Sequence, residues 1–220
     1  ANKHNLYVIE DAAQSIGAKY KEQKVGSFGT TGCFSLHPLK NLNVMGDAGV
    51  ITTNNHEIYD KLLKLRNHGL KDRDVCDCFG YNSRMDSIHA AIANLKLEYI
   101  DKWNKRHREI ASFYIENLKE IVQVPLEKDY EESVYHRFII RHHRRNELQE
   151  YLLREGIETK IHYPIPVHLQ PAAKYLGYKK GDFPMVEEQA STILSIPLYP
   201  QLTREQLNLV VNKIHNFVHK

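Results

Sequence analysis

A chain of 220 residues is long enough to bury a substantial core, either as one domain or as one domain with part of another. Hydrophobic residues make up 42% of the chain and charged residues 26%, which excludes a disordered composition, and a net charge of +3 is too small to indicate a nucleic-acid partner. No apolar stretch approaches the roughly 20 residues that span a bilayer, and the first residues lack the apolar core of a signal peptide. The composition therefore predicts a soluble cytoplasmic protein without a membrane partner.

In chain order, the hydrophobic pattern predicts an α/β protein in three parts. Residues 1–84 alternate short strands with a helix at 57–66, as the C-terminal part of a larger α/β domain would. Residues 85–120 have a helical pattern, and residues 121–220 alternate strands and helices again, as in a small α/β domain.

Two helical features are specific. The last helix should begin at Thr203 with a capping box, because Gln206 follows three residues later. A long helix in the region 85–120 should connect domains or line a dimer interface, since one face of it is apolar at three- and four-residue spacing: Ile88, Ile92, Leu95 and Tyr99.

The first part carries the chemistry. Leu6–Ile9 has the apolar, β-rich composition of a covered parallel strand, and Asp11 follows at its carboxyl end, where ligands gather in such sheets. Cys33–Leu36 reads as a second buried strand, and Lys40 follows it in a Ser/His/Pro turn. A single lysine is usually a solvated surface residue, and a single aspartate at a strand end is more often a helix cap. Together they are what a pyridoxal phosphate (PLP) enzyme needs: an amine for the Schiff base and a carboxylate for the pyridine nitrogen.

Other patterns in the sequence say less about function. The three cysteines are odd in number, and Cys76-x-Cys78 is one residue short of the CxxC pattern. Thirteen histidines are present, but no H-E-x-x-H motif or Cys/His ligand set, so no metal site is expected. The basic run at 141–145 is explained by a solvated turn between a strand and a helix.

A resemblance to one family covers essentially the whole chain. The strings are D-A-A-Q-S-I-G-A from Asp11, K-V-G-S-F-G from Lys24, F-S-L-H-P-L-K-N-L from Phe34, G-D-A-G-V-I-T-T-N from Gly46, L-R-N-H-G from Leu65, G-Y-N-S-R-M-D-S-I-H-A-A from Gly80, H-Y-P-I-P-V-H-L-Q-P from His162, G-D-F-P from Gly181 and S-I-P-L-Y-P from Ser195. They resemble the DegT/DnrJ/EryC1/StrS family of PLP-dependent sugar aminotransferases, which implies the aspartate aminotransferase fold (fold type I). Members carry an earlier segment with a Gly-Thr phosphate loop and a ring-stacking residue, so the chain is interpreted as the C-terminal part of a longer enzyme.

The resemblance implies a role for each cofactor-binding position. Lys40 would form the Schiff base and then act as the general base, and Asp11 would pair with the pyridinium nitrogen. Gln14 would lie near the 3-hydroxyl of the ring, and the Ser35 hydroxyl would donate to the phosphate. Asn82 would reach the phosphate of the partner subunit's cofactor, which implies a homodimer with shared active sites.

Four further residues are candidates for binding the substrate. His37 would line the substrate side of the site or merely cap its loop. His162, Tyr163 and His168 would contact the sugar or the pyrophosphate, or would only pack the H-Y-P-I-P turn. These alternatives stay open at the level of sequence.

The implied reaction is transamination of a nucleotide-linked keto-deoxysugar with L-glutamate as amino donor, at C3 or C4 of a 6-deoxyhexose. The G-D-A-G string at 46–49 departs from the commoner G-E-G-G and tilts the expectation slightly toward dTDP-linked 3-keto sugars. Two alternatives remain. A deoxysugar dehydratase of the same family would carry histidine in place of Lys40, and a non-catalytic or incomplete fragment would only bind or dimerise.

Overall fold

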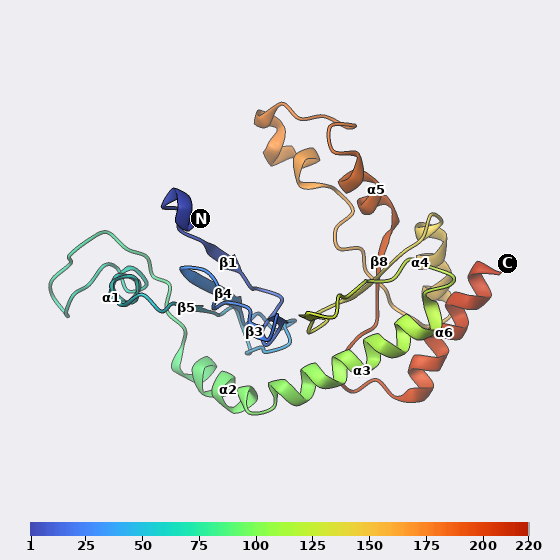
Figure 1. Cartoon of the computed structure of the whole chain (residues 1–220), viewed down its shortest axis with the longest axis horizontal. Coiled ribbons are helices and arrows are strands. Elements are labelled where there is room, and N and C mark those ends of the chain that lie inside the picture. The colour runs from blue at the N-terminus through green and yellow to red at the C-terminus, as the bar shows by residue number, and fades with distance from the viewer. Residues whose placement is uncertain (220) are drawn as a thin grey trace. The chain divides into compact units, whose positions relative to one another are not determined.

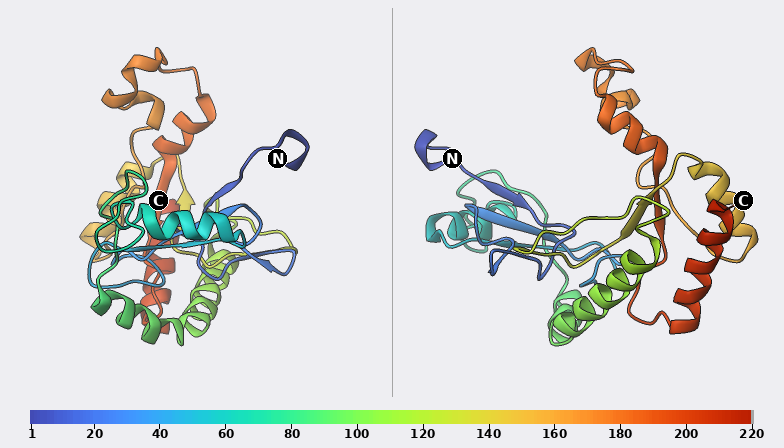
Figure 2. Two further views of the ribbon diagram at one scale, coloured as in Figure 1. Left: turned by 90° about the vertical axis from the view of Figure 1, so that its left-hand side faces the viewer. Right: turned by 45° about the vertical axis from the view of Figure 1, so that its right-hand side comes forward.

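The structure is a computed structural model that describes residues 1–219, and the chain divides into two compact units. The first unit consists of Ala1–Lys105 and Glu127–His136, and the second consists of Arg106–Leu126 and the chain from Arg137 onward. Helix α3 (Ile100–Leu118), green in both views of Figure 2, contains residues of both units, because the boundary between them falls at Lys105 and Arg106.

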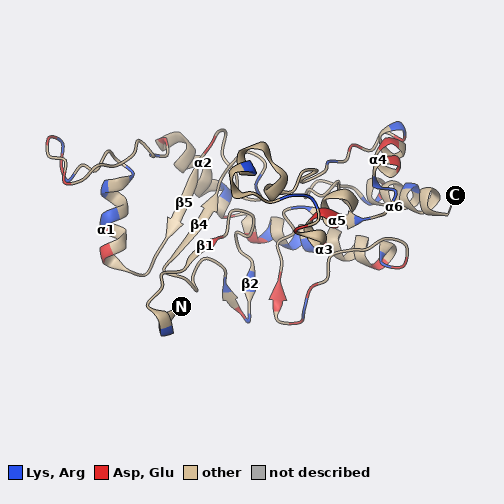
Figure 3. Cartoon of the chain, turned by 90° about the horizontal axis from the view of Figure 1, so that it is seen from above, with Lys and Arg blue, Asp and Glu red and all other residues tan. Residues whose placement is uncertain are grey.

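The first unit is built on a mixed sheet in which β4 (Thr31–Ser35) lies between β1 (Ile9–Asp11) and β5 (Gly49–Thr52), as Figure 3 shows. Strands β1 and β4 are parallel, and Asp11 pairs with Cys33. Strand β5 is antiparallel to β4, and Ser35 pairs with Gly49. Because β1 and β4 are parallel, their carboxyl ends place Asp11 and Ser35 at the same edge of the sheet.

A second small sheet in the same unit has the order β3 (Gln23–Lys24), β2 (Lys19–Tyr20), β6 (Glu131–Glu132). The turn between β2 and β3 consists of Lys21 and Glu22, whose φ angles are 47° and 65°. Two consecutive left-handed residues are the mark of a type I′ hairpin turn.

The helices of the first unit are η1 (Asn2–His4), α1 (His56–Leu65) and α2 (Ser87–Leu97), and Figure 1 shows their order along the chain. Helix α1 begins after Asn55, whose side chain accepts from the Ile58 N–H at 3.0 Å. A buried cluster lies behind the Lys40 turn: Leu36, Leu42, Val44 and Ile100, with Ile16, Met85, Ile92 and Trp103 packed against it.

The second unit pairs β7 (Phe138–Arg141) with β8 (Ile193–Ile196) in an antiparallel ladder. Its helices are α4 (Arg145–Arg154), η2 (Val167–Leu169), η3 (Pro171–Leu176), α5 (Pro184–Thr192) and α6 (Arg204–Val218). The core consists of fully buried apolar side chains from the strands, from α3, α4 and α6: Ile110, Tyr114, Phe138, Ile140, Leu148, Leu152, Leu194 and Ile214. The capping box at Thr203 and Gln206 is confirmed.

Two expectations for the first unit were wrong. Leu6–Ile9 is not a buried strand, since β1 begins only at Ile9 and the side chains of Tyr7 and Ile9 are 82% and 71% exposed. The helical region is two helices, α2 and α3, separated at Glu98–Tyr99, and not one long helix. On its expected apolar face only Ile92 packs against the core, while Ile88, Leu95 and Tyr99 are exposed.

None of the described helices has the length and apolar character that crossing a membrane requires. Among residues 1–219, no group of three or more His, Cys, Asp and Glu side chains is placed to hold a metal ion.

Candidate active site

The Lys40 turn is a short excursion from the end of β4. Its ends are closed by two backbone hydrogen bonds, from the Leu36 N–H to the Ala48 carbonyl at 2.8 Å and from the Val44 N–H to the Leu36 carbonyl at 2.9 Å. Within the turn the Lys40 N–H donates to the His37 carbonyl at 2.9 Å. The backbone at Lys40 is therefore fixed from within and held against the Leu36/Val44 cluster.

The side-chain amide of Asn41, the residue after Lys40, braces the turn. The Asn41 amide donates to the Asn104 carbonyl oxygen at 2.9 Å and to the Val134 carbonyl at 3.0 Å, and the Asn104 amide donates to the Ile16 carbonyl at 2.9 Å. Asn104 is only 6% exposed, so these bonds are shielded from water. They tie the residue after Lys40 to helix α3.

A second brace runs to helix α2. The Asn43 amide donates to the Lys40 carbonyl at 2.7 Å, and the Lys96 ammonium donates to the Asn43 side-chain oxygen at 2.6 Å. Sequence reasoning did not single out Asn41, Asn43 or Asn104. The available signal was two asparagines within three residues of the lysine, a composition that suits side-chain to backbone bonding in turns.

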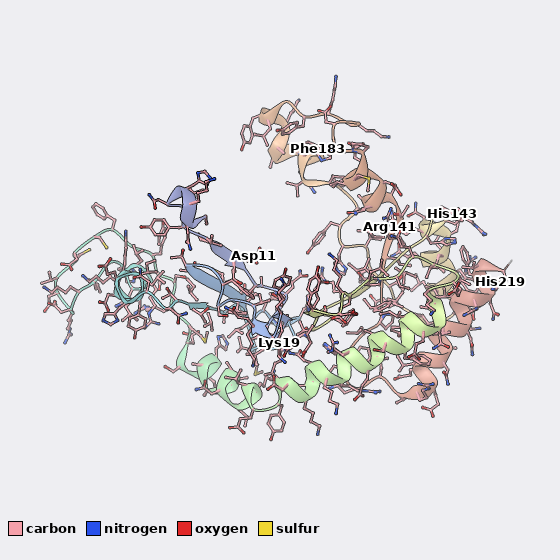
Figure 4. All side chains as sticks on the ribbon, in the orientation of Figure 1. Asp11, Lys19, Arg141, His143, Phe183 and His219 are labelled. Atoms are coloured by element: carbon pink, nitrogen blue, oxygen red, sulfur yellow. The ribbon has the colours of Figure 1, made fainter. Side chains whose placement is uncertain are left out.

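Asp11 lies at the carboxyl end of β1, where Figure 4 labels it. One carboxylate oxygen accepts from the Ala13 N–H at 3.1 Å, and the Ala12 N–H donates to the Cys33 carbonyl at 2.9 Å, so the chain stays bonded to β4 just past the end of β1. Asp11 is exposed, and this bond to Ala13 leaves its second oxygen available to a ligand.

Glu10, next to Asp11, clamps the loop that follows β3. Its carboxylate accepts from the backbone N–H groups of Gly26, Phe28 and Gly29 at 2.7, 2.7 and 2.6 Å. Burial raises the pKa of Glu10, but these three N–H donors stabilise the charged form more, so the pKa lies below its usual value. Glu10 therefore fixes β1 to the Gly-rich loop. Sequence reasoning missed Glu10 because no motif in the sequence marks an acidic residue next to a candidate ligand as one that binds backbone N–H groups.

The remaining first-unit candidates lie around the same turn or near α1. Ser35 is half-buried, and its hydroxyl accepts from the His37 N–H at 3.3 Å. His37 Nδ1 accepts from the Leu39 N–H at 3.2 Å, and its Nε2 lies 3.9 Å from an exposed Asp47 oxygen. Gln14 is exposed just after Asp11. The Lys40 side chain is half-buried and forms no hydrogen bond or ion pair with any described residue.

Asn82 lies apart from this cluster. It forms a β-bridge with Asn67, and its side-chain oxygen accepts from Arg84 at 3.4 Å. Arg84 also donates to the Asn67 side chain at 3.2 Å. Asn82 is exposed, and none of its hydrogen bonds with the described residues reaches the Lys40 turn.

In the second unit, His162 and Tyr163 lie together. His162 Nδ1 is 2.9 Å from the Ser195 hydroxyl, and the Arg137 guanidinium lies 5.9 Å from the centre of the Tyr163 ring. Burial lowers the pKa of His162, and the positive charges of Arg137 and Lys160 lower it further. His162 is therefore neutral at pH 7, while the exposed Tyr163 presents its ring and hydroxyl to solvent.

His168 is engaged within the second unit. Its Nε2 lies 3.0 Å from a Glu187 oxygen, and the side chains are 9% and 14% exposed. Glu187 also accepts from the Gly181 N–H at 2.8 Å, and the Phe183 ring contacts His168 in a tilted arrangement with ring centres 4.7 Å apart. Figure 4 labels Phe183 beside α5. In this structure His168 thus fastens η2 to α5.

Comparison with known proteins identifies the family. Residues 1–215 match the DegT/DnrJ/EryC1/StrS aminotransferase family. The chain belongs to this family. The residues of the D-A-A-Q and H-P-L-K strings that the structure places around the edge of the first-unit sheet are those by which the sequence resembles it.

Three curated relatives are similar to this chain over nearly its whole length. The chain is 43% identical to the pleiotropic regulatory protein of Geobacillus stearothermophilus, covering 99% of this chain and 59% of the relative. It is 41% identical to the dTDP-3-amino-3,6-dideoxy-alpha-D-galactopyranose transaminase of Aneurinibacillus thermoaerophilus, covering 99% and 60%. It is 38% identical to the UDP-N-acetyl-3-dehydro-alpha-D-glucosamine 3-aminotransferase of Acidithiobacillus ferrooxidans, covering 100% and 59%.

Two solved structures agree with the fold. Streptomyces venezuelae DesV, solved in complex with a ketimine intermediate, matches with a TM-score of 0.97 at 35% identity over 100% of this chain and 60% of that one. A DegT/DnrJ/EryC1/StrS aminotransferase from Brucella abortus matches with a TM-score of 0.94 at 35% identity, covering 100% and 59%. The chain thus spans about three fifths of the length of its relatives. The expected α/β fold of fold type I aminotransferases is confirmed for this portion.

Proposed function

We propose that the chain supplies the lysine-bearing part of a PLP-dependent aminotransferase that acts on a nucleotide-linked keto-deoxysugar. The observation that carries this proposal is the Lys40 turn. An amine without an ion pair among the described residues is held on a doubly braced turn, at the sheet edge where Asp11 and Ser35 end their parallel strands.

The donor set at this edge fits PLP. The cofactor needs an amine for covalent attachment, a carboxylate for its ring nitrogen and donors for its phosphate, and Lys40, Asp11 and Ser35 supply one of each. When bound, PLP supplies an electron-withdrawing ring that stabilises negative charge on the adjacent substrate carbon.

Each residue has a proposed task. The Lys40 amine holds the cofactor and then moves a proton to and from the substrate carbon. Asp11 keeps the ring nitrogen protonated, and Ser35 donates its hydroxyl to the phosphate. Gln14 lies near the 3-hydroxyl, and Asn82 serves the phosphate of the partner subunit's cofactor in a homodimer with shared sites.

The proposed substrate is aminated at carbon 3. Support comes from three relatives whose names place the amino group at carbon 3. Two are dTDP-sugar transaminases, to which the chain is 35% and 41% identical, and one is a UDP-sugar aminotransferase, to which it is 38% identical. The amino donor is L-glutamate, and the enzyme is cytoplasmic. His37, His162 and Tyr163 contact the substrate, with His162 as a neutral hydrogen-bonding group. His168 is paired with Glu187, so it would contact the substrate only if the interaction between His168 and Glu187 is broken.

Borohydride trapping tests the proposal. We expect the purified protein with added PLP to be yellow, because an imine between PLP and a lysine absorbs visible light. Borohydride reduction of this imine should fix the cofactor covalently on Lys40. Peptide mapping would show this as a blocked tryptic site after Lys40, with Lys24 cleaved normally as the internal control. Label spread over surface lysines, or no label on any lysine, would contradict the assignment of Lys40. Label at Lys40 without glutamate-dependent turnover would favour the alternative of a chain that binds the cofactor without catalysis.

Asp11→Asn separates the cofactor role from a structural one. Asparagine keeps the oxygen that accepts from the Ala13 N–H but removes the charge, so PLP should still bind while kcat falls by at least tenfold. The control is Ser15→Ala, four residues further along the chain. Near-normal turnover in Asp11→Asn would show that Asp11 serves only the turn.

A further inference from the structure

A loop between α1 and Asn82 carries two exposed cysteines, and the function proposed above does not use them. The ends of the loop are pinned: the His68 N–H donates to the Tyr81 carbonyl at 2.9 Å, and the Tyr81 N–H donates to the Leu65 carbonyl at 2.7 Å. Cys76 and Cys78 lie between these points, and both are exposed.

The two thiols face the same stretch of backbone. Cys76 Sγ donates to the Cys78 carbonyl at 2.9 Å and lies 3.4 Å from the His68 carbonyl. A Cβ atom built on Gly69 would lie 3.2 Å from Cys78 Sγ. Both sulfur atoms therefore lie close to the His68–Gly69 segment.

The residue between the cysteines is held in a bend. The Asp77 N–H donates to the Gly69 carbonyl at 3.0 Å, and the Asp77 carboxylate forms an ion pair with Lys64 at 2.5 Å. Two successive Cα steps of about 3.8 Å reach little more than 7 Å when extended, and a bend shortens that span into the range that a disulfide bridges. The short chain between Cys76 and Cys78 and the bend at Asp77 thus allow their Cα atoms to come within the range that a disulfide spans.

We propose that Cys76 and Cys78 form a reversible disulfide, which makes this loop a redox modification site. A low-molecular-weight disulfide such as oxidised glutathione is the oxidant. One cysteine thiolate attacks it, forming a mixed disulfide and releasing one thiol; the second cysteine then attacks the mixed disulfide and releases the other. Two protein thiols lose two electrons and two protons, and the external disulfide is reduced to two thiols.

A bond of this kind belongs to the labile class of disulfides, because exposed or strained disulfides have higher reduction potentials than structural ones. Its formation removes the Cys76 donor from the His68 and Cys78 carbonyls. The His68 N–H donates to the carbonyl of Tyr81, the neighbour of Asn82, so we expect the change to extend to the residue proposed to bind the partner's cofactor. This last link rests on the proposed function, whereas the disulfide itself does not.

Peptide mass analysis tests the disulfide without any cofactor. Trypsin releases both cysteines in one peptide, 74–84, and Cys33 in another, 25–40. After oxidised glutathione and alkylation, we expect peptide 74–84 to be lighter by two hydrogen atoms and to take no alkyl group, with full reversal by reduced glutathione. Cys33 is the internal control and should stay alkylated. Two alkyl groups or two glutathione adducts on peptide 74–84 would overturn the proposal.

The variants Cys76→Ser and Cys78→Ser should each stop at a mixed disulfide with glutathione. Hydrogen exchange then tests the link to Asn82: we expect the His68 and Tyr81 amides to lose protection in the oxidised wild type and not in either variant. Unchanged protection in the oxidised protein would overturn the coupling to Asn82 and leave the disulfide site standing.

Discussion

At the scale of single residues, the position of Lys40 depends on amides that do no chemistry. Asn104→Ala would remove two hydrogen bonds, the one that Asn104 accepts from the half-buried Asn41 amide and the one that it donates to the Ile16 carbonyl, and a typical hydrogen bond contributes about 0.5–1.5 kcal/mol. We expect the midpoint of urea unfolding to fall accordingly. Lys102→Ala, two residues earlier on the exposed face of α3, is the matched control and should change it little. Equal midpoints for the two variants would mean that the amide network does not brace the turn.

Glu10 makes a prediction about pH. Its pKa is lowered in the folded protein, so its contribution to stability is fully present above the unfolded value of about 4.3 and is lost as pH falls through the folded pKa. Glu10→Gln should therefore lower the urea midpoint at pH 7, and its difference from wild type should shrink at pH 4 and below. Glu22→Gln, on an exposed residue, is the control. A difference that is the same at both pH values would assign the effect to shape and not to charge.

The residue scale also shows what sequence can reveal about a site. Lys40 and Asp11 were proposed from sequence because a lysine after a Ser/His/Pro turn and an acid after a strand are a combination that PLP chemistry requires. Asn104 was not, because it lies 63 residues from its partner Asn41, and its amide acquires meaning only when α3 packs against the turn. Sequence thus suggests candidate reactive groups, whereas the groups that hold them in place are visible only in the fold.

At the scale of elements, the β2–β3 hairpin shows a local conflict between residue type and conformation. Lys21 and Glu22 have φ angles of 47° and 65°, and left-handed backbone costs ordinary residues about 1 kcal/mol or more each. Lys21→Asn with Glu22→Gly supplies the residue types that type I′ turns prefer, so we expect a gain of about 1 kcal/mol in the free energy of unfolding. Lys24→Asn, within β3, should give no gain. A destabilised double variant would show that the Lys21 contacts with the Tyr20 and Tyr130 rings outweigh the strain.

The α2–α3 break shows where element prediction fails. The sequence from Leu95 to Asp101 contains no glycine or proline, so nothing local marks an end. The break falls immediately before Ile100, which is buried in the cluster behind the Lys40 turn. Packing, and not propensity, sets this boundary, whereas the capping box at Thr203 and Gln206 is a local signal and was predicted.

At the scale of the whole molecule, the fold class was predictable because family motifs recur in order along the whole chain, but burial was not. Leu6–Ile9 has the composition of a covered strand, yet its side chains are largely exposed. An apolar run indicates that a surface is to be covered without stating what covers it. The same reasoning leads to a prediction about the isolated chain.

Residues 1–220 should self-associate. Within the described residues, β1 and β5 each pair only with β4, so both have an open edge, and they carry exposed apolar side chains, with Ile9 71% and Ile51 51% exposed. Open apolar edges promote strand pairing between chains, and in a pure sample only another copy is available. Light scattering should therefore give a mass that rises above 25.6 kDa with concentration.

Lysine at an open edge opposes such pairing, so Ile9→Lys with Ile51→Lys should return the mass toward that of one chain. The control is Leu126→Lys, which adds a charge at a residue that is 90% exposed but lies outside the strands of this sheet. It should leave the association unchanged. If the wild-type chain scatters as a single copy at every concentration, or if the Leu126 variant dissociates as readily as the edge variant, then the open edges of the first-unit sheet are not what the chain uses to associate.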